Sequence, residues 1–207
     1  MYRGPDIPRM ATQFSMIGIM NAALLAQGQQ EITTENDGSL EFRTMFRNWP
    51  SIVEAELEDG KYFFTKQQSQ LVTRSDGKFG FSDAYLVPSE AIHVRNLWLV
   101  DVTGERYQTD WIQDGSYVHL NNADGCWVEW VNVPDIDIWT ATFVLGIKMK
   151  MEALILRSVK EEYAEASDMD SDADMVLQRA RTNSSKARST RPAYQKGPIS
   201  RARSRNG

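Results

Sequence analysis

The sequence predicts an α+β fold in which N- and C-terminal helices form a bundle, an antiparallel β-sandwich or barrel is inserted between them, and an extended C-terminal tail follows. Apolar residues recur every three to four positions towards both ends of the chain but alternate in its middle. Turn-forming pairs with glycine recur through that middle block. The predicted parts are N-terminal helices over 1–61, a β domain over 62–133, C-terminal helices over 134–181 and a basic tail over 182–207.

The first helix is indicated by Met10, Phe14, Ile17, Asn21 and Leu24, which are spaced for one helix face. Gly28 follows this stripe. Glycine adopts the left-handed conformation that ends many helices without a steric cost, so the helix is expected to end at this residue. The polar residues 29–38 are expected to form a loop.

A second helical stripe runs from Phe42 to Leu57, with Ser39 placed to cap its first turn. Pro50 interrupts the stripe. Because proline lacks the backbone N–H that a helix interior uses, either the helix kinks at Pro50 or a separate short helix starts there.

From Tyr62 to Val133 the sequence favours short strands, because segments rich in β-branched and aromatic residues alternate with turn signals. The expected strand segments are Tyr85–Val87, Ile92–Val102, Tyr117–Leu120 and Cys126–Val133. The expected turns are Asp76-Gly77, Thr103-Gly104, Asp114-Gly115 and Asp124-Gly125. Their regular spacing is typical of an antiparallel sandwich or small barrel.

Helical spacing returns after Pro134, where Phe143, Ile147, Met151 and Ile155 lie on one side while Leu145 adds apolar character elsewhere. A helix that is apolar over so much of its surface is buried on several sides, inside a bundle or between subunits. Lys160 to Ala166 is expected to be its polar end. Ser171-x-x-Asp174 resembles a capping box that would start a further helix.

Charged residues are distributed unevenly along the chain. The whole chain carries 23 Lys+Arg and 28 Asp+Glu, yet the stretch from Arg179 to Gly207 holds nine basic residues and no acidic one. The remainder, 1–178, therefore has 14 basic and 28 acidic residues and a formal charge of −14. A basic segment of this kind binds an acidic surface, either a nucleic acid or an acidic protein, or it only improves solubility.

The predicted partner-binding residues are the nine basic residues of this stretch: Arg179, Arg181, Lys186, Arg188, Arg191, Lys196, Arg201, Arg203 and Arg205. Two features weigh against nucleic acid as the partner. The acidic remainder of the chain repels a polyanion, and Tyr194 is the one aromatic residue of the stretch available to stack on a base. The stretch has the composition of a segment that orders on a partner.

The sequence gives little indication of an active site, a cofactor or a metal centre. It lacks the glycine-rich phosphate loops and the usual hydrolase motifs. His93 and His119 have no ligand-spaced partners, and Cys126 has no neighbouring histidine to activate it. The alternating aspartates from Asp168 to Asp174 invite a calcium interpretation, but Ala173 and Arg179 stand where an EF-hand needs glycine and glutamate. The chain is therefore predicted not to be an enzyme and to need no cofactor.

Targeting and membrane signals are also weak. The most apolar early stretch, Phe14 to Ala26, is interrupted by Asn21 and is shorter than the ~20 residues that span a bilayer. With one cysteine, the chain has no intramolecular disulfide framework. The expectation is a soluble protein made in a cytoplasm, without a membrane partner.

In its order of helices, strands and helices the chain resembles the head-to-tail adaptor proteins of short-tailed double-stranded DNA bacteriophages, known as tail tubular protein A. The resemblance spans most of the chain. Asn21-Ala-Ala-Leu-Leu-Ala-Gln-Gly28 is similar to the opening helix of that family. The stretch from Phe46 to Leu57 followed by Tyr62-Phe63-Phe64 is similar to its second helix and exit, with Tyr62 where tryptophan is usual.

Later segments carry the resemblance further. Tyr85-Leu86-Val87-Pro88-Ser89-Glu90 resembles a tyrosine–proline–aspartate strand signature, with Glu90 in place of the aspartate. Trp127 to Val133 and then Asp135 to Leu156 resemble the strand, aspartate and long apolar helix of the family. Arg179-Ala180-Arg181 and the arginine-rich end resemble its C-terminal helix and extension.

The resemblance implies a non-enzymatic virion protein of the phage neck, assembled in the host cytoplasm as a ring, typically a dodecamer. Such a ring docks beneath the portal protein, extends the channel through which double-stranded DNA passes, and presents a platform for the tail nozzle. The C-terminal extension would grip the portal. The alternative that remains from the residues alone is a nucleic-acid-binding protein that uses the same basic tail.

Overall fold

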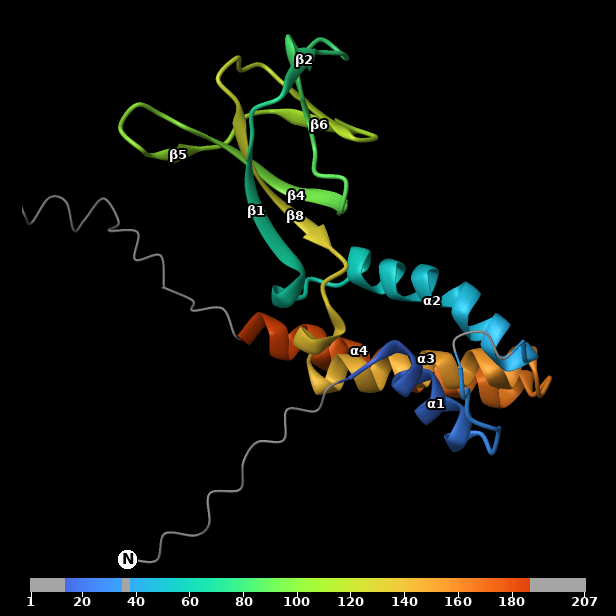
Figure 1. Cartoon of the computed structure of the whole chain (residues 1–207). Coiled ribbons are helices and arrows are strands. Elements are labelled where there is room, and N and C mark those ends of the chain that lie inside the picture. The colour runs from blue at the N-terminus through green and yellow to red at the C-terminus, as the bar shows by residue number, and fades with distance from the viewer. Residues whose placement is uncertain (1–13, 35–37, 187–207) are drawn as a thin grey trace, which may run out of the picture.

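The computed structural model describes residues 14–34 and 38–186, and within them the chain is α+β, as predicted. The α-helices are α1 (Met16–Ala26), α2 (Leu40–Asp59), α3 (Ala141–Ser158) and α4 (Tyr163–Lys186), and two short 3₁₀ helices are η1 (Phe63–Thr65) and η2 (Ile136–Ile138). The four α-helices lie together on one side of the molecule and the strands on the other (Figure 1).

Eight strands of the described chain form two four-stranded antiparallel sheets. The strands are β1 (Lys66–Leu71), β2 (Arg74–Asp76), β3 (Asp83–Leu86), β4 (Ala91–Val100), β5 (Arg106–Tyr107), β6 (Trp111–Asp114), β7 (Tyr117–Leu120) and β8 (Cys126–Asn132). One sheet has the order β1-β8-β4-β5 and the other β2-β3-β7-β6. All of them lie between α2 and α3 in the sequence, where the β block was expected.

Both N-terminal helices begin and end where the sequence indicates, or close to it. In α1 the Ser15 hydroxyl accepts a hydrogen bond from the Gly18 amide at 3.0 Å, and Gly28 has the left-handed conformation (φ +68°) that was expected after the helix. In α2 the Ser39 hydroxyl accepts from the Phe42 amide at 3.1 Å, which confirms the predicted cap. The part of the first stripe at Met10 lies outside the described residues.

Pro50 starts no new helix, because α2 is continuous across it. Two side chains close to Pro50 form hydrogen bonds with backbone carbonyl groups of the same helix. The Asn48 amide donates to the Thr44 carbonyl at 2.7 Å, and the Ser51 hydroxyl donates to the Asn48 carbonyl at 3.0 Å. These bonds, with the burial of Trp49 and Val53 against the other helices, hold the helix through the position where proline removes a backbone donor.

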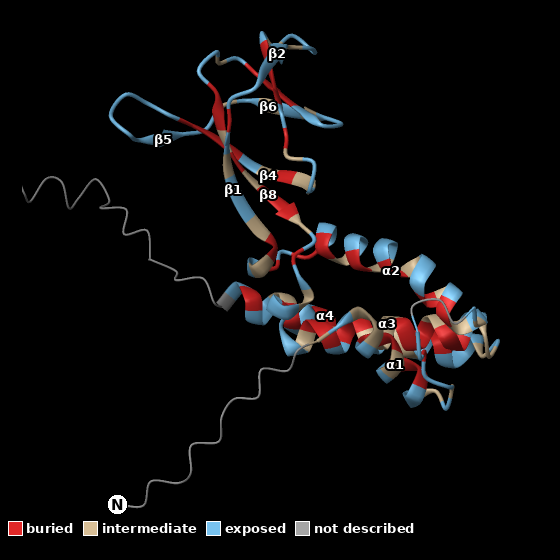
Figure 2. Cartoon of the chain, in the orientation of Figure 1, coloured by how far each residue is buried: buried red, intermediate tan, exposed pale blue. Residues whose placement is uncertain are grey.

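The helices share one hydrophobic core centred on α3, whose Phe143, Ile147, Met151 and Ile155 are fully buried. α1, α2 and α4 all pack on α3, and burial is concentrated where they meet it (Figure 2). The burial of α3 on several sides, which the sequence left open between a bundle and a subunit interface, is therefore achieved within one chain. Tyr62 packs its ring edge-on to Phe143 with the ring centroids 4.8 Å apart.

The two sheets share a second core. Leu97 and Val128 of one sheet and Tyr85, Val118 and Leu120 of the other are almost completely buried in it. All four predicted turns connect successive strands. The sequence missed β1, β2, β5 and β6, because these strands are short or largely exposed and carry few apolar residues.

The predicted start of the last helix is wrong. Ser171 lies inside α4, where its hydroxyl donates to the Ser167 carbonyl at 3.0 Å, so it is not a cap. The helix begins eight residues earlier, at Tyr163, after a tight turn in which Glu161 takes the left-handed conformation (φ +58°). It also continues to Lys186, five residues past the predicted end of the helical part at residue 181.

Contacts with α3 explain why α4 is one long helix. Gly146 of α3 lets Leu177 of α4 approach so closely that a Cβ at position 146 would lie 2.5 Å from the leucine side chain. Lys150 of α3 binds Asp170 and Asp174 of α4. Asp174, which was predicted to belong to a helix cap, therefore lies inside α4 together with Asp170, and both pair with a lysine of the neighbouring helix.

Candidate partner-binding site

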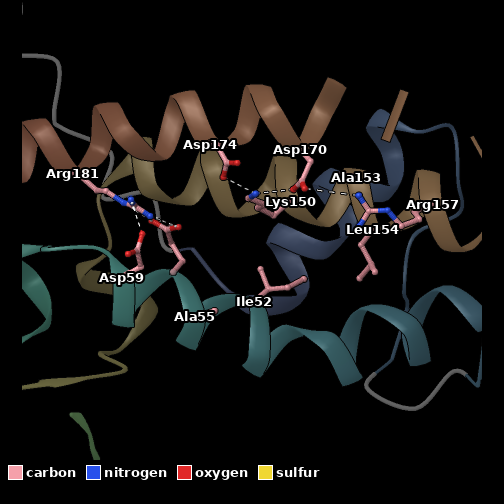
Figure 3. Close-up of a pocket in the computed structure, with 11 residues that line it drawn as sticks. Ile52, Ala55, Asp59, Lys150, Ala153, Leu154, Arg157, Asp170, Asp174 and Arg181 are labelled. Carbon is pink, nitrogen blue, oxygen red and sulfur yellow. Dashed lines mark hydrogen bonds and ion pairs between the residues drawn. The ribbon is translucent and has the colours of Figure 1, made fainter. Parts of the chain in front are cut away.

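The C-terminal end of α4, from which the basic stretch continues, is fixed to α2 by Arg181. Its guanidinium forms a two-pronged ion pair with Glu56, with Nε 3.0 Å from Oε1 and Nη2 2.9 Å from Oε2. Its Nη1 lies 2.9 Å from an Asp59 carboxylate oxygen. A planar guanidinium matches a carboxylate in this geometry far better than an ammonium does. Arg181 is drawn together with Asp59 in Figure 3.

Tyr62 is also part of this network. Its hydroxyl donates a hydrogen bond to the same Glu56 carboxylate that Arg181 binds. Burial of the ring, reinforced by the hydrogen bond and the negative charge of Glu56, raises the pKa of Tyr62 far above its ordinary value. The hydroxyl therefore remains a donor at every physiological pH.

One turn further along α4, Ser184 makes a second attachment. Its hydroxyl accepts a hydrogen bond from the backbone amide of Phe63, which belongs to η1 at the entry to β1. Ser184 is buried, and Ala180 beside it lies in the helical core. The end of α4 is therefore attached both to α2 and to the start of the β region.

A groove of about 380 Å³ runs between α2, α3 and α4 and includes Arg181 (Figure 3). Lys150 Nζ lies 2.7 Å from Asp170 and 2.6 Å from Asp174, and Arg157 lies 3.8 Å from Asp170. Burial lowers the pKa of Lys150, but its hydrogen bonds to the two aspartates outweigh that effect and raise it, so the ammonium stays charged. The four acidic and three basic side chains of the groove thus pair with one another, which suits a seam between helices.

The predicted partner-binding residues fall into four groups. Arg179 is exposed on α4, whereas Arg181 is bound within the chain. Lys186 is the last residue of α4. The other six, Arg188, Arg191, Lys196, Arg201, Arg203 and Arg205, lie outside the described residues.

An apolar groove of about 410 Å³ between α1 and α3 was not predicted. Phe14, Ile19, Val144 and Leu145 line it, and the small residues Gly18 and Ala22 of α1 leave it open. Leu145 is 45% exposed on a helix whose other large apolar residues are mostly buried. The sequence does show apolar residues on a second side of α3. That pattern alone does not tell whether they line a surface groove or lie in the core.

His119 and Cys126 have structural surroundings. The buried ring of His119 accepts a hydrogen bond from the Lys78 amide at Nδ1 over 3.2 Å and meets Phe79 edge-on. Burial raises the pKa of the Cys126 thiol to about 12, which leaves almost no thiolate at neutral pH. In the described ranges no three His, Cys, Asp or Glu side chains are grouped to hold a metal ion.

Across residues 14–34 and 38–186, no helix combines the length and apolar character needed to cross a membrane. Comparison of the chain with protein-family models gives no match, and a search of curated proteins also finds no match.

Proposed function

We propose that this chain is a structural head-to-tail connector of a phage virion, a ring beneath the portal that extends the DNA channel and presents the platform for the tail. In this proposal the four helices act as the bundle that faces the portal, the two sheets act as an inserted sandwich that faces the tail nozzle, and the basic tail grips the portal. Neither catalysis nor a cofactor has a part in it.

The observation that carries the proposal is how the basic stretch is attached. Six basic residues follow position 186 without a single acidic one, and they continue from a helix end that Arg181 and Ser184 fix to the rest of the chain. A segment without acidic residues that leaves a rigid attachment point suits a tether that orders on an acidic protein surface. The resemblance in helix and strand order supports the portal as that surface.

Contacts between copies of the ring need a different surface, because α3 is already covered by helices of its own chain. The apolar groove between α1 and α3, with the exposed Leu145 at its side, is the surface that supports self-association in this proposal. The acidic charge of residues 1–178 supports a conduit role, since a channel of the same sign as DNA does not retain it.

The test is cosedimentation with isolated portal rings of the same phage, with free duplex DNA as a parallel arm. The informative truncation removes residues 187–207, because a cut at 179 would also remove Arg181 and Ser184 and confuse folding with binding. A full-length variant with the six tail arginines and lysines replaced by glutamine is the matched control for length. We expect the intact chain to bind portal stoichiometrically and both variants to lose most of that binding.

Retention of portal binding by both variants would overturn the role of the tail. Binding to DNA alone, falling steeply with salt, would replace the connector with a nucleic-acid-binding protein, the second function that the tail residues allow. That alternative is favoured by the run of basic residues and opposed by the acidic remainder of the chain.

A further inference from the structure

A cleft of about 720 Å³ lies where the ends of α2 and α4 meet β1, β4 and β8. Arg95 and His93 of β4 form its wall, Lys61 and Glu58 stand at the α2 side, and Ser184 and Ser185 stand at the α4 side. It shares Asp59 with the groove of the Arg181 network, but its other lining residues differ from those of that groove. Its volume is sufficient for one or two residues of another chain.

Three acidic and three basic side chains line this cleft, so its lining is neutral as a whole, but not all of these groups are paired. Lys66 pairs with Glu129 at 2.9 Å, and Asp59 pairs with Arg181 at 2.9 Å. Glu58, Lys61 and Arg95 are the charged lining groups that have no ion pair among the described residues.

Of these three groups, Arg95 is the one that is partly buried. Its Nη2 donates to the Gly60 carbonyl, while its buried Nη1 has no hydrogen-bond partner among the described residues, and no described carboxylate lies within ion-pair distance of it. Burial lowers the pKa of this guanidinium, with Glu129 opposing the effect, yet an arginine stays charged in proteins. A partly buried cation without a direct carboxylate partner is the arrangement that an incoming anion stabilises.

His93 lies two residues from Arg95 in the same strand, and the pKa of His93 responds to the charge of Arg95. Its Nδ1 is buried and also has no hydrogen-bond partner in the described part of the chain. Burial and the positive charge of Arg95 lower the pKa of His93, and Glu58 opposes them. Lys61, Lys66, Asp59 and Glu129 are the other charged groups that line the cleft.

We infer that this cleft binds a carboxylate side chain of a protein partner, seated against Arg95 and between the polar side chains of the cleft wall. A carboxylate compensates the guanidinium charge and can accept from the Ser184 hydroxyl, whose oxygen accepts from Phe63 and whose proton is free to donate. Glu58, Asp59 and Glu129 around the cleft disfavour a phosphodiester chain, which brings several negative charges at once. The basic tail of the chain itself has no carboxylate side chain to offer.

The test uses the full chain and follows its two histidines by NMR pH titration. The probes are acetate and, as a phosphodiester mimic, dimethyl phosphate, each replacing chloride at constant ionic strength. We expect acetate to raise the pKa of His93 by a few tenths of a unit, since a nearby anion favours the imidazolium. His119, in the other sheet, serves as the internal reference and is expected to be unaffected.

Two variants separate binding from folding. Arg95→Gln is expected to abolish the acetate effect on His93, and Arg95→Lys, which keeps the charge, is expected to preserve most of it. An absent acetate effect in the unmodified chain would overturn the site. A larger effect of dimethyl phosphate than of acetate would overturn the choice of a protein carboxylate and indicate a nucleic-acid backbone instead. Neither result depends on the connector proposal, because the experiment contains no portal.

Discussion

Arg181 of α4 and Glu56 of α2, 125 positions apart in the sequence, form a bidentate ion pair at 2.9–3.0 Å. The pair joins the last helix to the second one at the point where the chain turns into the β region. Glu56 is mostly buried and receives the Tyr62 hydroxyl as well, so removing its arginine leaves a carboxylate short of its main partner.

Arg181→Ala is therefore expected to lower the free energy of unfolding by about 2–3 kcal/mol, somewhat less than for a fully buried pair because the arginine is partly exposed. Urea denaturation followed by circular dichroism measures the loss. Arg179→Ala, at an exposed position of the same helix, is the matched control and is expected to change stability by less than about 0.5 kcal/mol. Equal effects of the two substitutions would contradict a structural role for Arg181.

The same pair predicts how two truncations differ. Removal of 187–207 is expected to leave the unfolding midpoint nearly unchanged, since none of the hydrogen bonds or ion pairs described above uses those residues. Removal of 179–207 is expected to lower it by at least as much as Arg181→Ala, because Ser184 is lost too. Thermal unfolding of both truncated chains checks this, and similar midpoints would show that the end of α4 adds little stability.

Gly146→Ala tests the close contact of α3 and α4. The added methyl group would lie 2.5 Å from the Leu177 side chain, so the helices must separate, at an expected cost of about 1–3 kcal/mol despite the better helix propensity of alanine. In a Leu177→Ala background the same substitution is expected to cost much less, because the space is then available. A double-mutant cycle by urea denaturation measures this coupling, and additive effects would mean that the contact is not the cause.

Asp83 gives the fold an acid-sensitive element in the second sheet. The Ser82 hydroxyl bonds to this buried carboxylate, and with Arg74 it lowers the pKa of Asp83 below its usual value near 3.8, although burial opposes the shift. A carboxyl group whose pKa is lower when folded stabilises the protein above its unfolded pKa and loses that contribution as the pH falls through the folded value.

Asp83→Asn should accordingly destabilise the chain at pH 5 and above, with the difference from the unmodified protein shrinking as the pH falls below about 4. Urea midpoints measured from pH 2.5 to 6 follow this trend, and Asp110→Asn at an exposed position is the control. A difference that stays constant over the whole range would rule out the ionised carboxylate as its source.

Glu161 holds the left-handed conformation in the turn between α3 and α4 and is exposed. Glycine adopts that conformation without the Cβ strain, so Glu161→Gly is expected to stabilise the chain by up to about 1 kcal/mol, after allowing for the greater flexibility of unfolded glycine. Glu161→Ala removes the carboxylate but keeps the Cβ, and it is expected to give no gain. Thermal unfolding of the pair distinguishes backbone strain from charge.

Sequence signals were reliable where a residue affects only the conformation of its near neighbours in the chain. Ser39 caps α2, Gly28 follows α1 in the left-handed conformation, and the four glycine-containing turns connect strands, because each depends on chemistry within a few positions. The turn at Glu161 was missed because no such local signal marks it. It contains neither glycine nor proline, and tertiary packing imposes its conformation.

The roles of individual charges could not be read from the sequence. Arg181 was grouped with the tail because it is followed by basic residues, yet its partners come from α2. Asp174 was predicted to belong to a cap at a helix start, although it lies mid-helix and pairs with Lys150. The uncompensated Arg95 has no signal in the sequence at all. Its meaning depends on which carboxylates the fold brings near it.

The attachment of Ser184 to Phe63, next to that of Arg181 to Glu56, also decides how the chain responds to a mechanical load. Tension applied at residue 187 reaches α2 through the ion pair and the entry to β1 through the hydrogen bond, before it can peel α4 from α3. The two attachments lie about one turn apart on α4, so peeling from the end of the helix loads the Ser184 contact first and the Arg181 contact next. These two contacts are therefore the first in the described fold to oppose tension on the terminal segment.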